Sequence, residues 1–316
     1  MDFNLTEEQT AFRDTVHRWV DAELPKDLMR KLEADEENYP YEIWDKLKEQ
    51  GFFGIGIPEE YGGLGGDVVM QMIFAREMAR TAGGLLWVWG LTSFGGAKTL
   101  ATAGTEEQRK KWLPQMAAGD LRVSLSMTEP DGGTDVLGAM KTYADKVEGG
   151  WKINGAKMWT TAARAADRLL VLCRSDRNAA KKHHGLTAFF VDAKSPGIIA
   201  TLLPKLGMRA MGSCSVTYDD VFVPDEDVLG EPHKAWSSIM LPISPRPRSW
   251  LNCCSTMSPG CRHRACRAVT RQICSRWLRP NAQWRRRILA SRYWAAWAIR
   301  QKPTCSVTGA ITGFCG

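Results

Sequence analysis

Residues 124–135 read S-L-S-M-T-E-P-D-G-G-T-D and join the end of a predicted strand to a glycine turn. The first four residues alternate in polarity, which predicts a half-buried strand. Pro130 ends the strand because proline cannot donate a ladder hydrogen bond. Gly132 and Gly133 leave backbone amides open to close approach, and with the Thr134 hydroxyl they form a plausible phosphate cradle. The residues alone leave two interpretations open, an anion-binding loop and an ordinary surface turn.

Two stretches of the chain carry motifs of a known family. The pattern T-E-P-x-x-G-[ST]-D at residues 128–135 resembles the flavin-binding signature of the acyl-CoA dehydrogenases. Residues 151–161, W-K-I-N-G-A-K-M-W-T-T, resemble the strand pair that comes next in that family, I-N-G-x-K-x-W-I-T. The resemblance extends from residue 1 to about residue 231. It implies an FAD-dependent flavoprotein, an oxidoreductase of fatty acid metabolism.

The resemblance implies cofactor contacts at seven residues in and beside the two motifs. The flavin ring would be flanked by Thr128 and by the backbone of Leu125 and Met127, and the pyrophosphate would meet Gly133 and Thr134. Trp159 would pack against the isoalloxazine, and the Thr161 hydroxyl would hydrogen-bond near N5. Trp159 could alternatively pack in the protein core, but its matched surroundings favour the flavin.

Other polar residues bear on ligand binding. Thr134 and Arg209 are expected to contact the substrate. Asp131 stands where the family usually has glycine, and its charge is expected to weaken pyrophosphate binding. His183 and His184 lie in a basic turn, K-K-H-H-G, which indicates solvated surface, so no metal site is predicted.

The periodicity of the sequence predicts a multi-domain α+β fold. Helical spacing fills residues 1–118 and predicts an all-α bundle, with helices at 5–23, 41–50, 67–81, 85–103 and 105–117. Strand patterns fill residues 119–231, at 122–127, 142–147, 150–153, 158–161, 168–174, 186–191, 198–203 and 215–221. Short strands separated by turn residues indicate a β-barrel or sandwich for this middle domain.

The charge of the chain is divided unevenly. From Pro232 to the C-terminus there is no Asp or Glu, while 13 arginines and two lysines contribute +15. The first 231 residues hold the other 27 of the 42 basic residues and all 35 acidic ones, a net charge of −8. Seven of the nine cysteines also lie in the tail, which leaves Cys173 and Cys214 in the body. Two cysteines suit a reduced compartment without disulfides.

Residues 232–316 do not resemble the four-helix domain that follows in the family. That domain is therefore expected to be missing or disrupted, and the resemblance assigns no catalytic residue because the family's glutamate lies there. A basic nucleic-acid arm is one interpretation of the tail. Another is a zinc site at Cys261, His263 and Cys266, but neither its spacing nor its ligand count fits a usual finger.

A shifted reading frame is the interpretation we favour for the tail. When residues 292–298, R-Y-W-A-A-W-A, are translated from the third base of each codon, the genetic code forces one leucine and two glycines. Permitted synonymous codons complete V-L-G-G-M-G-Y, which resembles the family's Q-V-L-G-G-x-G-Y segment. We therefore expect a frameshift and an inactive or impaired enzyme.

The resemblance also implies ligands and partners. The family reaction is α,β-dehydrogenation of an acyl-CoA thioester, with an electron-transfer flavoprotein as electron acceptor. The homo-oligomer usual in the family is not assumed for this chain, and neither nucleic acid nor membrane is an expected partner. The sequence predicts a cytoplasmic location. The competing hypotheses are a non-catalytic flavin-binding remnant and a basic-tailed interaction protein.

Overall fold

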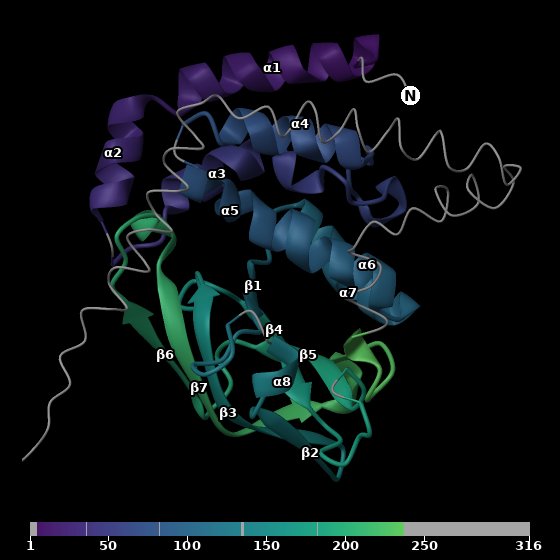
Figure 1. Cartoon of the computed structure of the whole chain (residues 1–316). Coiled ribbons are helices and arrows are strands. Elements are labelled where there is room, and N and C mark those ends of the chain that lie inside the picture. The colour runs from purple at the N-terminus through teal and green to yellow at the C-terminus, as the bar shows by residue number, and fades with distance from the viewer. Residues whose placement is uncertain (1–4, 36, 82, 134–135, 182, 237–316) are drawn as a thin grey trace, which may run out of the picture. The chain divides into compact units, whose positions relative to one another are not determined.

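The computed structural model describes residues 5–236 with the exception of residues 36, 82, 134, 135 and 182 (Figure 1). The expectations for residues 237–316 therefore lie outside the described residues. Helices occupy the first part of the described chain and strands the second part. This order confirms the α+β arrangement expected from the sequence.

The helices precede the first strand, apart from one short helix in the β region. They are α1 (Glu7–Glu23), α2 (Lys26–Ala34), α3 (Tyr41–Glu49), α4 (Val68–Met78), α5 (Leu86–Trp89), α6 (Lys98–Ala103), α7 (Glu106–Ala117) and the short α8 (Val136–Ala139). Capping boxes begin α1 and α7, with Thr6 and Gln9 in the first and Thr105 and Gln108 in the second. Each box satisfies otherwise unpaired amides of the first helical turn.

The prediction of a single regular helix at 85–103 is wrong. A π-helical segment, η4 (Gly90–Ala97), separates α5 from α6. Short 3₁₀ turns occur at η1 (Phe52–Gly54), η2 (Glu59–Tyr61), η3 (Gly83–Leu85), η5 (Arg209–Met211) and η6 (Asp225–Asp227). No helix was predicted at α2, whose N-cap residue, Pro25, makes no side-chain capping hydrogen bond.

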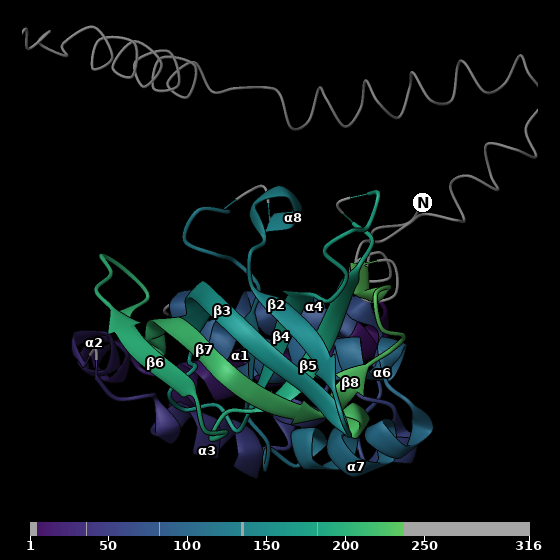
Figure 2. The same cartoon turned by 90° about the horizontal axis from the view of Figure 1, so that it is seen from below.

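One mixed sheet contains the strands β1 (Val123–Ser126), β2 (Tyr143–Val147), β3 (Gly150–Thr161), β4 (Arg168–Arg174), β5 (Leu186–Asp192), β6 (Ile198–Leu203), β7 (Ser213–Pro224) and β8 (Val228–Leu229). Its order is β6-β7-β3-β2-β4-β5-β8, with β1 beside β4. Figure 2 shows β6, β7, β3 and β2 side by side. Most pairs are antiparallel, but β4 runs parallel to β1 and β2.

The two strands predicted at 150–153 and 158–161 form one strand, β3. Its pairing with β7 shifts register twice, between Ile153 and Gly155 and between Lys157 and Thr160. Gly155 has φ +141°, and an added Cβ would lie 2.6 Å from the Cα of Thr142. Because bulges interrupt the alternation of side chains, the sequence resembles two strands where the backbone continues as one.

The π-helical segment packs directly on β1. A Cβ added to Gly96 would lie 2.9 Å from Val123, so only glycine permits this approach. The Val123 N–H also donates to the Thr92 hydroxyl at 3.1 Å. Farther along the chain, Trp112 of α7 contacts Phe190 of β5, with ring centroids 4.7 Å apart. Helices and sheet therefore share a hydrophobic core on which the end of β1 is fixed.

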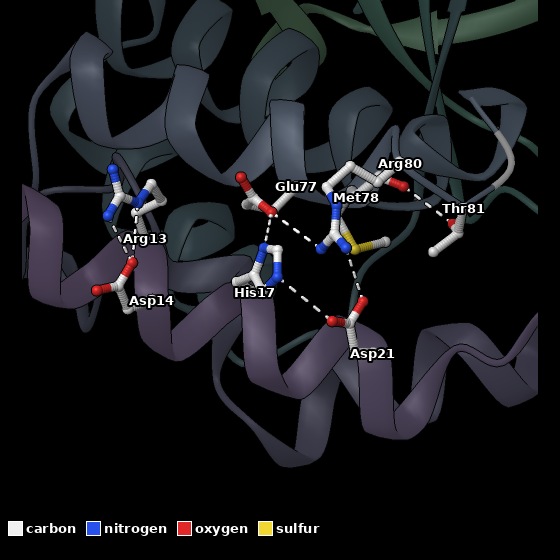
Figure 3. Close-up of polar contacts among 8 residues, drawn as sticks. All are labelled: Arg13, Asp14, His17, Asp21, Glu77, Met78, Arg80 and Thr81. Atoms are coloured by element: carbon white, nitrogen blue, oxygen red, sulfur yellow. Dashed lines mark hydrogen bonds and ion pairs between the residues drawn. The ribbon is translucent and has the colours of Figure 1, made fainter.

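A polar cluster joins α1 to α4 (Figure 3). Nδ1 of His17 lies 2.8 Å from the Glu77 carboxylate, and its other ring nitrogen lies 3.3 Å from Asp21. Arg80 contacts Glu77 at 3.1 Å and Asp21 at 2.8 Å. The side chain of Glu77 is only 5% exposed, so these contacts satisfy a buried carboxylate between the helices.

Candidate functional site

The two sequence motifs meet where β1 ends and β3 ends. The Ser124 hydroxyl donates to the carbonyl of Thr161 at 2.6 Å, and the Met158 N–H donates to the carbonyl of Thr128 at 2.7 Å. Between these contacts, the hydroxyl of Ser126 lies 3.1 Å from that of Thr160. The residues expected near the flavin ring therefore come from two segments that lie side by side.

Trp159 projects from a bulge at the end of β3. Its φ of +61° lies in the left-handed region, which residues other than glycine rarely adopt. The residue is 53% exposed, so the alternative of core packing is wrong. Tryptophan is largely buried on average in folded proteins, and an exposed indole held by an unusual backbone conformation is a candidate ligand contact.

The other residues expected at the flavin ring lie on the same two segments, at the end of β1 and the end of β3. Leu125 is partly buried against the core, and its Cδ1 would lie 3.1 Å from a Cβ added to Gly95. Met127 and Thr128, after the buried Ser126, are also partly buried. The Thr161 hydroxyl lies 3.3 Å from that of Ser213, on the neighbouring strand β7.

The glycine turn is described only in part. Gly132 is buried and its N–H donates to the carbonyl of Glu129 at 3.0 Å, so the expectation of an open amide is wrong at this residue. Gly133 is exposed, and no atom lies within 4 Å of where its Cβ would be. Thr134, expected to contact both pyrophosphate and substrate, lies outside the described residues. Asp131 is exposed and lies 2.7 Å from the Lys141 ammonium, whose hydrogen bond lowers the pKa of the carboxyl.

Arg209 is placed on η5, beside the second helix. Its backbone N–H donates to the carboxylate of Glu33, in α2, at 2.8 Å. Arg209 is half-buried, and the residue before it, Met208, has φ +56°. The substrate contact expected at Arg209 remains a prediction.

Glu129 and Lys157 form a buried ion pair that the sequence motifs did not single out. The Lys157 side chain is 0% exposed, and its Nζ lies 2.9 Å from Oε1 of Glu129 and 3.1 Å from the carbonyl of Met127. Burial alone would raise the pKa of Glu129, but the Lys157 charge and the N–H donors of Lys141 and Thr142 outweigh it and lower the pKa. This carboxylate is therefore held ionised.

Other candidate reactive groups lie apart from this site. His183 and His184 are exposed, as their basic turn predicted, and among the described residues no cluster of His, Cys, Asp and Glu could hold a metal ion. Cys173 and Cys214 are free and buried, and burial raises the pKa of the Cys173 thiol to about 12. No helix in the described ranges is long and apolar enough to cross a membrane.

Two family models match the chain: the N-terminal domain of acyl-CoA dehydrogenases at residues 6–120 and the middle domain at residues 124–221. This chain belongs to the acyl-CoA dehydrogenase family. It is 35% identical over 233 residues to the mitochondrial 2-methylacyl-CoA dehydrogenase of Solanum tuberosum, covering 73% of this chain and 55% of that protein. The chain thus spans about half the length of this relative.

Two further comparisons agree with this family. A subunit of the caffeyl-CoA reductase–Etf complex of Acetobacterium woodii is 32% identical over 237 residues, or 74% of this chain and 61% of that subunit. The glutaryl-coenzyme A dehydrogenase glutaryl-CoA complex superposes with a TM-score of 0.70 at 33% identity, covering 77% of this chain and 61% of the other. Members of the family are flavoproteins that use FAD.

The described residues fit a flavin. They supply an exposed indole at Trp159, a hydroxyl at Thr161 and a glycine backbone open to close approach at Gly133. These groups suit the aromatic, polar and anionic parts of FAD respectively. The charge of Asp131, which could oppose a pyrophosphate, is paired with Lys141.

Proposed function

We propose that residues 1–231 bind FAD at the junction of β1 and β3 and form the cofactor half of an acyl-CoA dehydrogenase. The exposed Trp159, beside Thr128 and two residues before Thr161, is the observation that carries this proposal. When bound, FAD supplies the acceptor for the hydride that leaves the acyl chain. The acyl group is that of a CoA thioester, and the acceptor of the electrons is an electron-transfer flavoprotein, as the Etf-linked relative suggests.

The chain's own residues would bind and orient the cofactor. Trp159 offers a face against which a flat ring system can stack. Thr161 carries a hydroxyl that can donate to a ring nitrogen, while Ser213 at 3.3 Å limits its rotation. The exposed backbone at Gly133 is open to a phosphate, whereas the Gly132 N–H is already bonded within the turn. Leu125 and Met127, packed against the core, would exclude water from one side of the ring.

We propose further that this chain dehydrogenates acyl-CoA slowly or not at all. The reaction requires a carboxylate placed to remove the α-proton. No Asp or Glu follows Glu231, and residues 232–316 show the features of a shifted frame. Glu129 is the acid nearest to the motif, but its carboxylate is 5% exposed and bonded to Lys157 and two backbone amides. It is not available as a base.

A flavin titration tests the cofactor site. We expect Trp159→Ala to weaken FAD binding by about tenfold, since a lost aromatic contact is worth about 0.5–1.5 kcal/mol beyond the area it buries. Trp159→Phe, which keeps an aromatic face, is the matched control and should bind nearly as well as the parent. A parent chain that neither retains nor binds FAD would refute the cofactor site.

Dye reduction with an acyl-CoA substrate separates the competing functions. The chain as written should reduce the dye about 10²–10⁴-fold more slowly than a version in which the alternative frame is restored. Equal turnover by the two versions would contradict our proposal that the tail impairs catalysis. FAD binding without turnover in either version would favour the non-catalytic remnant. A nucleic-acid shift assay with a tail deletion tests the basic-tailed interaction protein.

A further inference from the structure

The Glu129 carboxylate joins the two ends of the glycine-turn segment. One of its oxygens accepts the Lys141 N–H at 2.6 Å, and the other accepts the Thr142 N–H at 3.0 Å. Glu129 precedes residues 130–140, and Lys141 and Thr142 follow them. A single side chain therefore closes the base of this segment, which includes Gly132 and Gly133.

Lys157 connects this closed base to the strand that carries Trp159. Its Nζ bonds both the Glu129 carboxylate at 2.9 Å and the Met127 carbonyl at 3.1 Å. Two residues earlier, Gly155 permits Thr142 to lie against β3, where any larger residue would collide. The glycine turn, the end of β1 and the end of β3 are thus linked through one ion pair.

We propose that Glu129 and Lys157 are positioning residues, which hold the Gly132–Gly133 turn at a fixed place relative to Trp159 for the phosphate-bearing half of FAD. The inference rests on the proposed cofactor site and adds the groups that pre-organise it. A binding loop that is already ordered does not have to lose conformational entropy when the ligand arrives. A ligand without phosphates depends much less on this turn.

The substitution Glu129→Gln tests the closure with little change in shape. Glutamine has one acceptor oxygen, and its NH₂ group would face an N–H donor or the Lys157 ammonium. The base of the segment therefore loses at least one charge-assisted hydrogen bond. Glu77→Gln is the matched control, because Glu77 is an equally buried glutamate that contacts Arg80 and His17, but its contacts join α1 and α4 and lie outside the glycine turn.

The experiment titrates the full chain, its Glu129→Gln variant and its Glu77→Gln variant with FAD and with riboflavin, which lacks phosphates. We expect Glu129→Gln to weaken FAD binding by about tenfold or more, the loss of one hydrogen bond to a charged group, and riboflavin binding by less than about threefold. Glu77→Gln should leave the ratio of the two affinities unchanged. Hydrogen exchange at Lys141 and Thr142 should accelerate in Glu129→Gln only.

Three results would overturn the inference. Unchanged FAD affinity in Glu129→Gln would do so while leaving the proposed cofactor site intact. Equal weakening of FAD and riboflavin, or the same change in Glu77→Gln, would indicate general destabilisation. A parent chain that binds no FAD would contradict the proposed function itself, and the positioning role with it. If Glu129→Gln does not fold, the double variant with Lys157→Met removes both charges together and is compared in the same way.

Discussion

Two glutamates, Glu77 in the helical region and Glu129 in the β region, have buried carboxylates that are stabilised by different kinds of partner. Each side chain is 5% exposed. Glu77 is satisfied by His17 and Arg80, whose side chains are 47% and 36% exposed. Glu129 is satisfied by Lys157, which is fully buried, and by two backbone amides.

The two sites differ in whether water can replace a lost partner of the carboxylate. Around Glu77, the partly exposed side chains of Arg80 and His17 remain hydrated when one contact is lost, and water can then replace part of the lost interaction. Around Glu129, removal of one partner leaves a charge without water or counter-charge in the protein interior. The first cluster ties two helices together, whereas the second fixes the backbone of a candidate binding loop.

The largest effect should come from Lys157→Met. This change leaves the Glu129 carboxylate buried without its cation, and breaking such a pair costs about 3–5 kcal/mol of unfolding free energy. Urea unfolding followed by circular dichroism measures it. The double variant Glu129→Gln with Lys157→Met should recover part of the loss. A cost below about 1 kcal/mol for Lys157→Met would show that the two glutamates do not differ as described.

A smaller effect is expected for Glu77→Gln. The amide keeps the volume and one acceptor of the carboxylate, while His17 and Arg80 can turn to water. We expect a loss of about 1–3 kcal/mol in the same unfolding assay. A loss as large as that of Lys157→Met would mean that the cluster between α1 and α4 is as sensitive as the pair under the loop.

The ionisation of Glu129 should make the unfolding free energy of the chain depend on pH in the acid range. Its pKa in the folded chain is lowered from the ordinary value of 4.5, so its ionised form stabilises the fold above that value. The contribution is lost as the pH falls through the folded pKa. The difference in unfolding free energy between the parent and Glu129→Gln should therefore be largest near neutral pH and should narrow below about pH 4.5. A constant difference across this range would contradict the assignment.

The smallest effect should be that of His17→Gln. The ring is half-exposed, and a polar contact made by a solvent-accessible side chain contributes about 0–1 kcal/mol. Glutamine can still donate to the Glu77 carboxylate from a similar position. Thermal unfolding should show a shift of at most a few degrees. A large loss would indicate that His17, not Arg80, is the main partner of Glu77.

Local signals in the sequence were sufficient for most of the fold. Helix starts at Thr6 and Thr105 follow from capping patterns, and β4 and β6 coincide with the predicted 168–174 and 198–203 because turn residues bound both. The β3 bulges and the π-helical segment could not be predicted, since both depend on contacts with residues distant in the chain. Gly155 against Thr142 is such a contact.

The candidate site was predictable only where a family motif exists. Trp159, Thr128 and Thr161 were found through their motifs, and the structure brings them together. The partnership of Glu129 with Lys157 was not predicted, because the chain has many lysines and nothing in the local pattern marks Lys157 as buried. One sequence signal could have indicated the pair, since Glu129 lies in the first motif and Lys157 in the second. The motifs identify the residues of the site, whereas the contacts between those residues can be seen only in the folded structure.

The conformation of Trp159 makes this residue unfavourable for the stability of the isolated chain. A left-handed backbone costs roughly 1–3 kcal/mol for a residue that is not glycine, and an exposed indole buries little surface in return. Selection for thermal stability alone would therefore replace Trp159, with glycine as the most favourable choice. A variant library sorted once for heat resistance and once for flavin retention should diverge at this position.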